Sequence, residues 1–136
     1  MQNKNIPHNL EAEQSVLGSM ILSKYALQKS ADALTKESFY STNNAEIFTC
    51  LINMYDKKIP IDITTLTTEL KNKNKLDAIG GVEYLTEIID YVPTAANVDH
   101  YIKLVEESAL LRRLIEVSTD IVTSAYNNEA SVNDTL

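Results

Sequence analysis

The sequence predicts an all-α fold in which several short helices are followed by one long helix. Gly and Pro occur only three times each among 136 residues, which is few for the many tight turns of a β-protein. Apolar residues recur three and four positions apart in successive segments, as they do on one face of a helix. Residues 97–127 then contain neither Gly nor Pro, which favours an uninterrupted helix.

The first helix is predicted to begin after Asn9, because Asn is a favourable helix cap. Glu11 and Glu13 follow in the first turn, where the positive end of the helix dipole favours acidic side chains. The apolar residues of this segment keep helical spacing: Leu10, Val16, Leu17, Met20 and Ile21. A second, short helix is predicted over residues 26–34.

Phe39 and Tyr40 are predicted to plug the loop that leads to a third helix, over residues 44–56. That helix has a broad apolar face, formed by Ile47, Phe48, Leu51, Ile52, Met54 and Tyr55. Pro60 marks the end of this segment, since the residue before a Pro disfavours helical backbone.

Two more short helices are expected before the long one. Asp62 is predicted to cap a helix over residues 63–73. Another helix, over residues 82–89, is placed between the Gly80-Gly81 turn and Pro93. Paired glycines between helices are typical of a turn that needs positive φ, although they also occur in phosphate-binding turns.

The segment 97–127 differs in kind from the others, because about 31 helical residues extend for about 45 Å. Two apolar rows run along it. The first is heptad-like: Tyr101, Leu104, Ser108, Leu111, Ile115, Ser118, Val122 and Ala125. The second comprises Leu110, Leu114, Val117 and Ile121. Together they are wider than a single coiled-coil seam, so this helix is expected to need two neighbours, one of which can be another chain.

Composition narrows the classes of function. The length fits one domain with one core. The net charge of -7 argues against autonomous DNA binding, because phosphate contacts need Lys and Arg. Cys50 is the only cysteine, so no internal disulfide forms, and a lone thiol fits the reducing cytoplasm. No secretory leader and no apolar run long enough to cross a membrane are evident, and a cytoplasmic location is expected.

The motifs that bind nucleotides are missing from this chain. Neither G-x-x-x-x-G-K-[ST] nor G-x-G-x-x-G occurs, and no Lys follows Gly18, Gly80 or Gly81 at the required place. We therefore expect neither a cofactor site nor an enzyme in these residues.

Other reactive groups have simpler interpretations. His8 and His100 are far apart in sequence and neither is near Cys50, so no metal site is predicted, and Cys50 is expected to pack in the core. Asp62 is predicted to be a helix cap rather than one of an acid pair with Glu69. The pair Arg112-Arg113 is interpreted as part of a salt-bridged surface rather than as a phosphate contact.

Several strings of residues occur in order and at family spacing along residues 5–127. They are Ile6-Pro7-His8-Asn9-Leu10-Glu11-Ala12-Glu13-Gln14-Ser15-Val16-Leu17-Gly18, Phe39-Tyr40, Ile47-Phe48, Pro60-Ile61-Asp62 with Thr65-Leu66, Ile79-Gly80-Gly81-Val82-Glu83-Tyr84-Leu85, Val92-Pro93-Thr94-Ala95-Ala96-Asn97-Val98 and Leu110-Leu111-Arg112-Arg113-Leu114-Ile115. The chain thereby resembles the N-terminal domain of DnaB-type bacterial replicative DNA helicases. It departs from the family's common pattern at Ser19, where a second Gly is usual, and at Asn44-Ala45, where a His-Arg pair is usual.

The resemblance implies a small globular helical head over residues 1–96 and the first helix of a helical hairpin over 97–128. Residues 129–136 are then a loop toward a second arm, a linker and an ATP- and Mg-dependent motor domain. The implied full-length protein is an ATP-dependent DNA helicase that forms a ring hexamer. Its N-terminal domains form a collar that pairs subunits and recruits primase. A helicase loader and single-stranded DNA are further implied partners, the DNA mainly through the motor.

Candidate site residues follow from the same resemblance. The contact with the second arm of the hairpin or with another subunit is expected at Leu111, Ile115, Val122 and Ala125. A primase-sensing surface is expected at Glu11, Tyr84, Ile115 and Ile121. Ordinary packing is the alternative for the apolar members of both sets.

Two competing interpretations remain at this point. One is the helicase-binding domain of a primase, whose fold is similar, although a primase carries that domain at its C-terminus. The other is an independent enzyme such as a small hydrolase, which the missing motifs argue against.

Overall fold

The computed structural model describes residues 6–92 and 94–135, with side chains as far as Glu129, and within these ranges only helices and connecting segments form. The all-α prediction is confirmed. Pro93, which was expected to close a helix, and the N-terminal residues 1–5 lie outside the described residues. The elements are α1 (Leu10–Leu22), α2 (Lys24–Ala33), η2 (Lys36–Ser38), α3 (Thr42–Asp56), α4 (Ile63–Asn72), α5 (Gly81–Tyr91), η3 (Ala95–Asn97) and α6 (Val98–Thr135).

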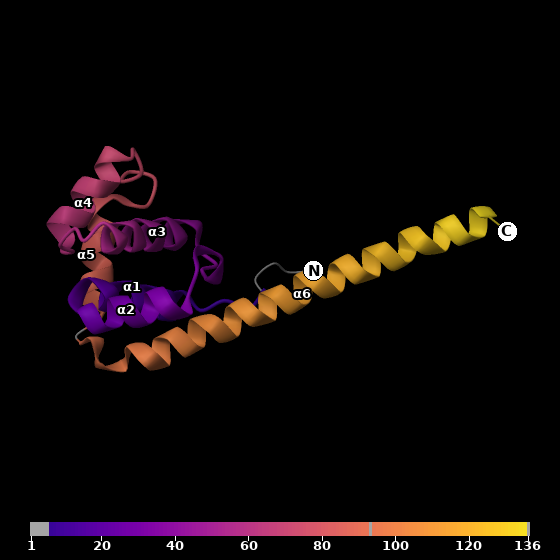
Figure 1. Cartoon of the computed structure of the whole chain (residues 1–136), viewed down its shortest axis with the longest axis horizontal. Coiled ribbons are helices and arrows are strands. Elements are labelled where there is room, and N and C mark those ends of the chain that lie inside the picture. Colours follow the sequence, from indigo (N-terminus) through magenta and orange to yellow (C-terminus); the bar gives the residue numbers. More distant parts are fainter. Residues whose placement is uncertain (1–5, 93, 136) are drawn as a thin grey trace.

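Figure 1 shows two parts of very different shape. Helices α1 to α5 pack together into a head, and α6 runs along the underside of the head and then extends far beyond it. Within the head, α1 contacts α2, α3, α5 and α6, whereas α4 packs against α3 and α5. The arrangement agrees with the predicted order of short helices followed by a long one.

Polar caps set the starts of the helices. Asn9 accepts a hydrogen bond from the Ala12 amide at 2.9 Å, and Asp62 accepts one from the Thr65 amide at 2.8 Å, as predicted for both. Ser23 and Ser41 cap α2 and α3 in the same way. These two caps place the starts of α2 and α3 two residues earlier than the apolar spacing had indicated, at Lys24 and Thr42.

Left-handed residues end α3 and α4. Lys58 has a φ of 60°, and the next amide, that of Ile59, donates to the carbonyl of Met54 at 2.9 Å. Asn74 has a φ of 57° and is followed by the same bond, from Lys75 to Leu70. Both are Schellman caps, which satisfy carbonyl groups left open at a helix end. The Gly80-Gly81 turn has the positive φ values predicted for it, 114° and 74°.

The core forms around α1. Val16, Leu17 and Met20 are almost fully buried and belong to one core with buried residues from the other α-helices of the head and from the start of α6. Gly18 allows α1 and α5 to approach closely, because a Cβ atom there would lie 2.8 Å from the carbonyl oxygen of Ile88. The hydroxyl of the next residue, Ser19, is buried and has no hydrogen-bond partner among the described residues.

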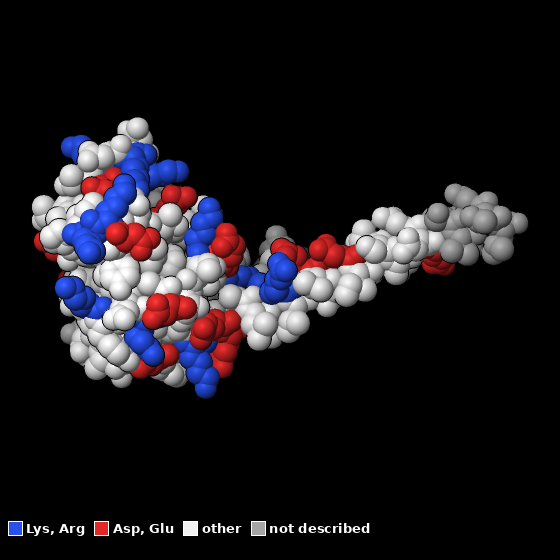
Figure 2. Space-filling model, in the orientation of Figure 1, with Lys and Arg blue, Asp and Glu red and all other residues white. Residues whose placement is uncertain are grey.

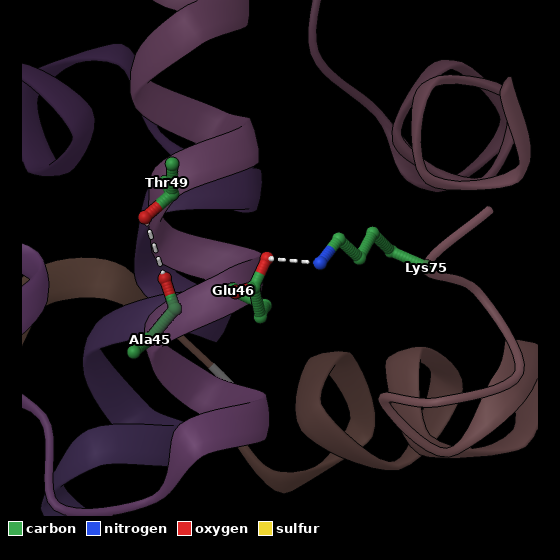
Figure 3. A network of polar contacts seen from close by, with 4 residues as sticks. All are labelled: Ala45, Glu46, Thr49 and Lys75. Carbon is green, nitrogen blue, oxygen red and sulfur yellow. Dashed lines mark hydrogen bonds and ion pairs between the residues drawn. The ribbon is translucent and has the colours of Figure 1, made fainter. Parts of the chain in front are cut away.

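A surface ion pair joins the loop after α4 to α3. Lys75 Nζ lies 3.7 Å from Glu46 Oε1, and the Thr49 hydroxyl beside it donates to the Ala45 carbonyl at 2.8 Å (Figure 3). The side chains of Lys75 and Glu46 are 48% and 39% exposed, so the pair contributes no more than about 1 kcal/mol to stability.

The prediction of a loop over residues 129–136 is wrong for residues 129–135, because α6 continues without a break to Thr135. Residue 136 lies outside the described residues. The sequence predicts that the helix ends near Asn127 and Asn128. Asn lowers helix stability by only about 0.5 kcal/mol per residue, and neither Gly nor Pro follows to stop the helix.

Arg112 fastens α6 to the head. Its guanidinium donates to the Pro7 carbonyl and to the Ser38 carbonyl, each at 2.9 Å, and lies 5.6 Å from the ring centre of Tyr40. His8 stacks on the same ring at 4.4 Å. Tyr40 is therefore an exposed contact of α6, and of the predicted Phe39-Tyr40 plug only Phe39 is buried.

Replacing Gly18 by Ala tests the close approach of α1 and α5. We expect Gly18→Ala to lower the free energy of unfolding by about 1–3 kcal/mol, because the new Cβ meets backbone that cannot move without repacking. The adjacent substitution Ser19→Ala is the control and is expected to cause no loss, because it removes a buried hydroxyl without a partner. Urea unfolding compares them, and equal stability of the two variants would contradict this account of the interface.

Replacing Arg112 by Met tests how α6 is attached. Arg112→Met keeps the aliphatic stem but removes both hydrogen bonds, so we expect a loss of about 2 kcal/mol. Amide exchange should also become faster in residues 6–9 and 38–41. The matched control is Arg113→Met, which removes only an exposed pair with Glu116 and is expected to change stability by less than about 0.5 kcal/mol. Indistinguishable effects of the two variants would rule out this role for Arg112.

Candidate functional site

The clearest candidate surface lies on α6, at the point where this helix leaves the head. Val98, Ile102 and Val105 are buried against the head. From residue 113 to residue 129, every side chain is exposed. We refer to this exposed stretch, residues 113–129, as the arm.

Eight apolar residues at and beyond the departure point form what we call the arm face. Seven of them are large and between 39% and 62% exposed. The arm face consists of Leu110, Leu111, Leu114, Ile115, Val117, Ile121, Val122 and Ala125. A continuous apolar surface of this kind is unusual on a soluble monomer and marks a place where another molecule binds.

The arm face does not continue the side of α6 that packs on the head. At about 100° per residue, Val98, Ile102, Val105 and Ala109 share one side of the helix. The same spacing continues through polar residues: Arg113, Glu116, Asp120, Thr123 and Asn127. The arm face is centred roughly opposite that side. The apolar side of α6 therefore changes as the helix leaves the head, and the arm face is directed away from it.

Charge follows the same division. Arg113 and Glu116 pair at 3.3 Å on the polar side of the arm. Figure 2 shows charged side chains on the arm close to the head and mostly uncharged surface further along. The earlier interpretation of Arg112-Arg113 as a salt-bridged surface therefore holds for Arg113, whereas Arg112 binds backbone carbonyls instead.

The structure places the four predicted subunit-contact residues on one exposed strip. Leu111, Ile115, Val122 and Ala125 all belong to the arm face. The exposed fractions of the first three are 49%, 49% and 53%, so a partner could cover much more of each side chain.

The four predicted primase-sensing residues fall in two places. Glu11 and Tyr84 lie on the head, where the Glu11 carboxylate accepts a bond from the Tyr91 hydroxyl at 2.9 Å. The Gln14 amide bridges α1 to α5 by donating to the Tyr84 hydroxyl at 3.4 Å. Ile115 and Ile121 lie on the arm. A surface that includes all four must therefore span both parts of the molecule.

A buried polar network lies beneath this part of the head. Glu13 is only 1% exposed. Its carboxylate accepts hydrogen bonds from the Tyr40 amide at 2.6 Å, the Ser41 amide at 3.3 Å and Asn44 Nδ2 at 2.9 Å. The Tyr84 hydroxyl donates to the Asn44 side chain. The network joins α1, α3 and α5, so the position of Tyr84 depends on it.

The sequence predicts Glu13 only as an acid at the positive end of the helix dipole, and its role in this network is revealed by the structure. A signal was present, because Glu13 precedes Val16 and Leu17 by three and four residues and so lies on the buried side of α1. Its three donors come from a loop and a helix start that are distant in sequence, and no local pattern predicts them.

Three titratable groups of the head have raised pKa values, each with a structural cause. Burial raises the pKa of the Cys50 thiol, which stays protonated in the core. Burial also raises the pKa of Tyr84, and its bonds with Gln14 and Asn44 only partly offset this. The bond to Glu11 raises the pKa of Tyr91. Among residues 6–92 and 94–135, no cluster of His, Cys, Asp and Glu could hold a metal ion, and no helix could span a membrane.

Comparison with known proteins identifies the family. Residues 5–107 match the model of the DnaB-like helicase N-terminal domain. The replicative DNA helicase DnaC of Bacillus subtilis (strain 168) is 42% identical over 130 residues, which are 96% of this chain and 29% of that protein. The replicative DNA helicase DnaB of Geobacillus stearothermophilus is 42% identical over 127 residues, which are 93% of this chain and 28% of that protein. The chain thus spans less than a third of these relatives.

Solved structures give the same result. The N-terminal domain of DnaB helicase from Mycobacterium tuberculosis matches with a TM-score of 0.89 and 39% identity, over 92% of this chain and 89% of that one. A DnaB-like replicative helicase, described with its interactions with primase, matches with a TM-score of 0.77 and 25% identity, over 87% of this chain and 28% of that one. The predicted resemblance is confirmed, and the chain belongs to the family of DnaB-like helicase N-terminal domains.

Proposed function

We propose that this chain is the N-terminal collar domain of a replicative DNA helicase subunit, which pairs subunits within a ring hexamer and recruits primase. The observation that carries the proposal is the arm face, which is apolar, exposed and directed away from the chain's own head. ATP, Mg and DNA unwinding belong, in this proposal, to a motor in the part of the protein that the relatives have and this chain does not span.

Burial of the arm face supplies the driving force for pairing. Each Leu, Ile or Val side chain that passes from water into a packed interface contributes about 1.5–3 kcal/mol at full burial. The strip formed by Leu111, Ile115, Val122 and Ala125 fits one neighbouring helix. The parallel row of Leu110, Leu114, Val117 and Ile121 fits a second one. One neighbour is the second arm of a hairpin, and the other is the arm of a second subunit.

Primase is the second proposed partner. The relative whose structure was described together with its primase interactions shares this fold at 25% identity. In our proposal the contact uses Glu11 and Tyr84 on the head with Ile115 and Ile121 on the arm. The buried network around Glu13 holds Tyr84 in place, so this contact surface is organised before the partner binds.

Other partners of the implied helicase receive less support from this chain. The net charge of -7 disfavours a direct grip on single-stranded DNA, which we assign mainly to the motor. A helicase loader is compatible with any exposed part of the collar. The alternative of a primase domain that binds helicase is not favoured by any observation here, because the matching family model and the named relatives are helicases.

Substitution of Ile115 tests subunit pairing. We expect Ile115→Asp to reduce self-association by at least tenfold in dissociation constant, because it places a carboxylate in the centre of the apolar strip. The matched control is Thr123→Asp, which adds the same charge on the polar side of the arm. Sedimentation velocity over a range of concentrations gives both constants. Equal association of the two variants, or no association of the unaltered chain, would exclude pairing through this strip.

Titration with a primase C-terminal domain tests the second contact. We expect the primase domain to bind the unaltered chain saturably, and isothermal titration calorimetry measures the dissociation constant. Ile121→Asp and Glu11→Lys should each weaken it about tenfold if these side chains are central to the interface. Thr123→Asp again serves as the control and should bind like the unaltered chain. Primase binding that none of these substitutions alters would show that the contact lies elsewhere on the domain.

A further inference from the structure

A groove of about 650 Å³ opens at the end of the head that is remote from the arm. Helices α1 and α3 both end there, at the left of Figure 1, whereas the arm leaves on the right. Met20 and Leu27 form its floor and are buried, while Ile59 and Ile61 form one wall. The volume lies within the range of about 300–1,000 Å³ that is typical of ligand-binding pockets.

The local backbone keeps this groove open. On one side, α1 ends at Leu22 and Ser23 begins α2 at once, so the chain turns back without filling the space. On the other side, the left-handed residue Lys58 ends α3, and Pro60 disfavours helical backbone in the residue before it. The segment 58–61 therefore runs along the groove as a wall instead of packing into it.

The rim of the groove is basic although the protein as a whole is acidic. Lys24 and Lys58 line it, both are exposed, and neither forms an ion pair with a described residue. Lys24 lies in the first turn of α2, which has no acidic residue there to offset the positive end of the helix dipole. The nearby carboxylate of Asp62 caps α4 and does not line the groove.

On the visible face of the head, Figure 2 shows basic side chains beside uncharged surface at the left end, with acidic side chains nearby. An apolar floor between two cations suits a ligand that is apolar in the middle and negatively charged at its edges.

We propose that this groove binds an acidic peptide segment that inserts one or two apolar side chains, and that the segment belongs to another protein. Apolar side chains take the floor at Met20 and Leu27, and the flanking carboxylates meet Lys24 and Lys58. A nucleic acid fits less well, because it needs several phosphate contacts and the groove offers only two cations. The groove lies away from the arm face, so a partner that covers the arm face does not by itself cover the groove.

A short labelled peptide tests the proposal directly. The probe has Leu and Phe in the middle with two acidic residues on each side, and binding to the 136-residue chain is measured by fluorescence anisotropy. One control peptide replaces the acidic residues by Lys, and another replaces Leu and Phe by Ala. We expect the probe to bind at least fivefold more tightly than either control, and its affinity to fall as salt is added.

Variants of the rim locate the binding. We expect Lys24→Gln and Lys58→Asn each to weaken the probe about threefold, and the double variant about tenfold. Asn is chosen at position 58 because it tolerates the left-handed backbone there. The matched control is Lys29→Gln, which removes an exposed charge from α2 outside the groove and should have no effect.

Several outcomes would overturn the proposal. Equal affinity for the probe and for the peptide with Ala in place of Leu and Phe would show that only the charges of the lysines matter and that the apolar floor is not used. Full binding by the double variant would place the site elsewhere. Tighter binding of a single-stranded oligonucleotide that depends on the same two lysines would reassign the groove to nucleic acid. Ile115→Asp should leave peptide binding unchanged, so failure here is distinguishable from failure of subunit pairing.

Discussion

Burial of α1 on almost every side is the constraint on which the rest of the head depends. A central helix must offer small or apolar side chains to each neighbour and must satisfy any polar group that it carries inward. Gly18 meets the first condition toward α5, where backbone lies against backbone. Glu13 meets the second, because the amides of the 40–41 loop and the Asn44 side chain approach its carboxylate. The bonds of Glu13 hold the loop that precedes α3, and Asn44 holds the Tyr84 hydroxyl.

The long helix α6 has two parts: the first packs on the head, and the second exposes its apolar side. Its first part is held on the head by buried apolar residues, and the contact ends at Arg112 with hydrogen bonds to backbone carbonyls. Beyond that residue the apolar side of the helix lies roughly opposite, away from the head. If the apolar residues of α6 formed one continuous stripe, the whole stripe would face the same side as the head. The change of side separates what the chain needs for its own folding from what it presents to others.

Much of this architecture could be predicted because helix formation is a local property. The spacing of apolar residues predicts all six α-helices of the described residues, and Asn9 and Asp62 are predicted as caps. The starts of α2 and α3 were misplaced because Ser23 and Ser41 cap them without an apolar signal. The end of α6 was misplaced because Asn is only a weak helix breaker.

The contacts of Glu13 and Arg112 could not be predicted, since both bind backbone groups that the fold brings from far away in sequence. The arm face, by contrast, is visible in the spacing of its apolar residues. The exposure of the arm face could not be predicted, because the spacing of apolar residues does not show which side of a helix packs against the same chain.

The continuity of α6 has a mechanical consequence. The arm adds about 25 Å of unbroken helix beyond Arg112, at 1.5 Å per residue. A rigid rod of that length works as a lever, so a tilt of about 10° at its base carries the far end through about 4 Å. Small rearrangements of the few atoms around the Arg112 guanidinium are thereby magnified into movements as large as the width of a side chain. The position of a partner bound to the arm therefore depends on how α6 is held at Arg112 and along its buried residues.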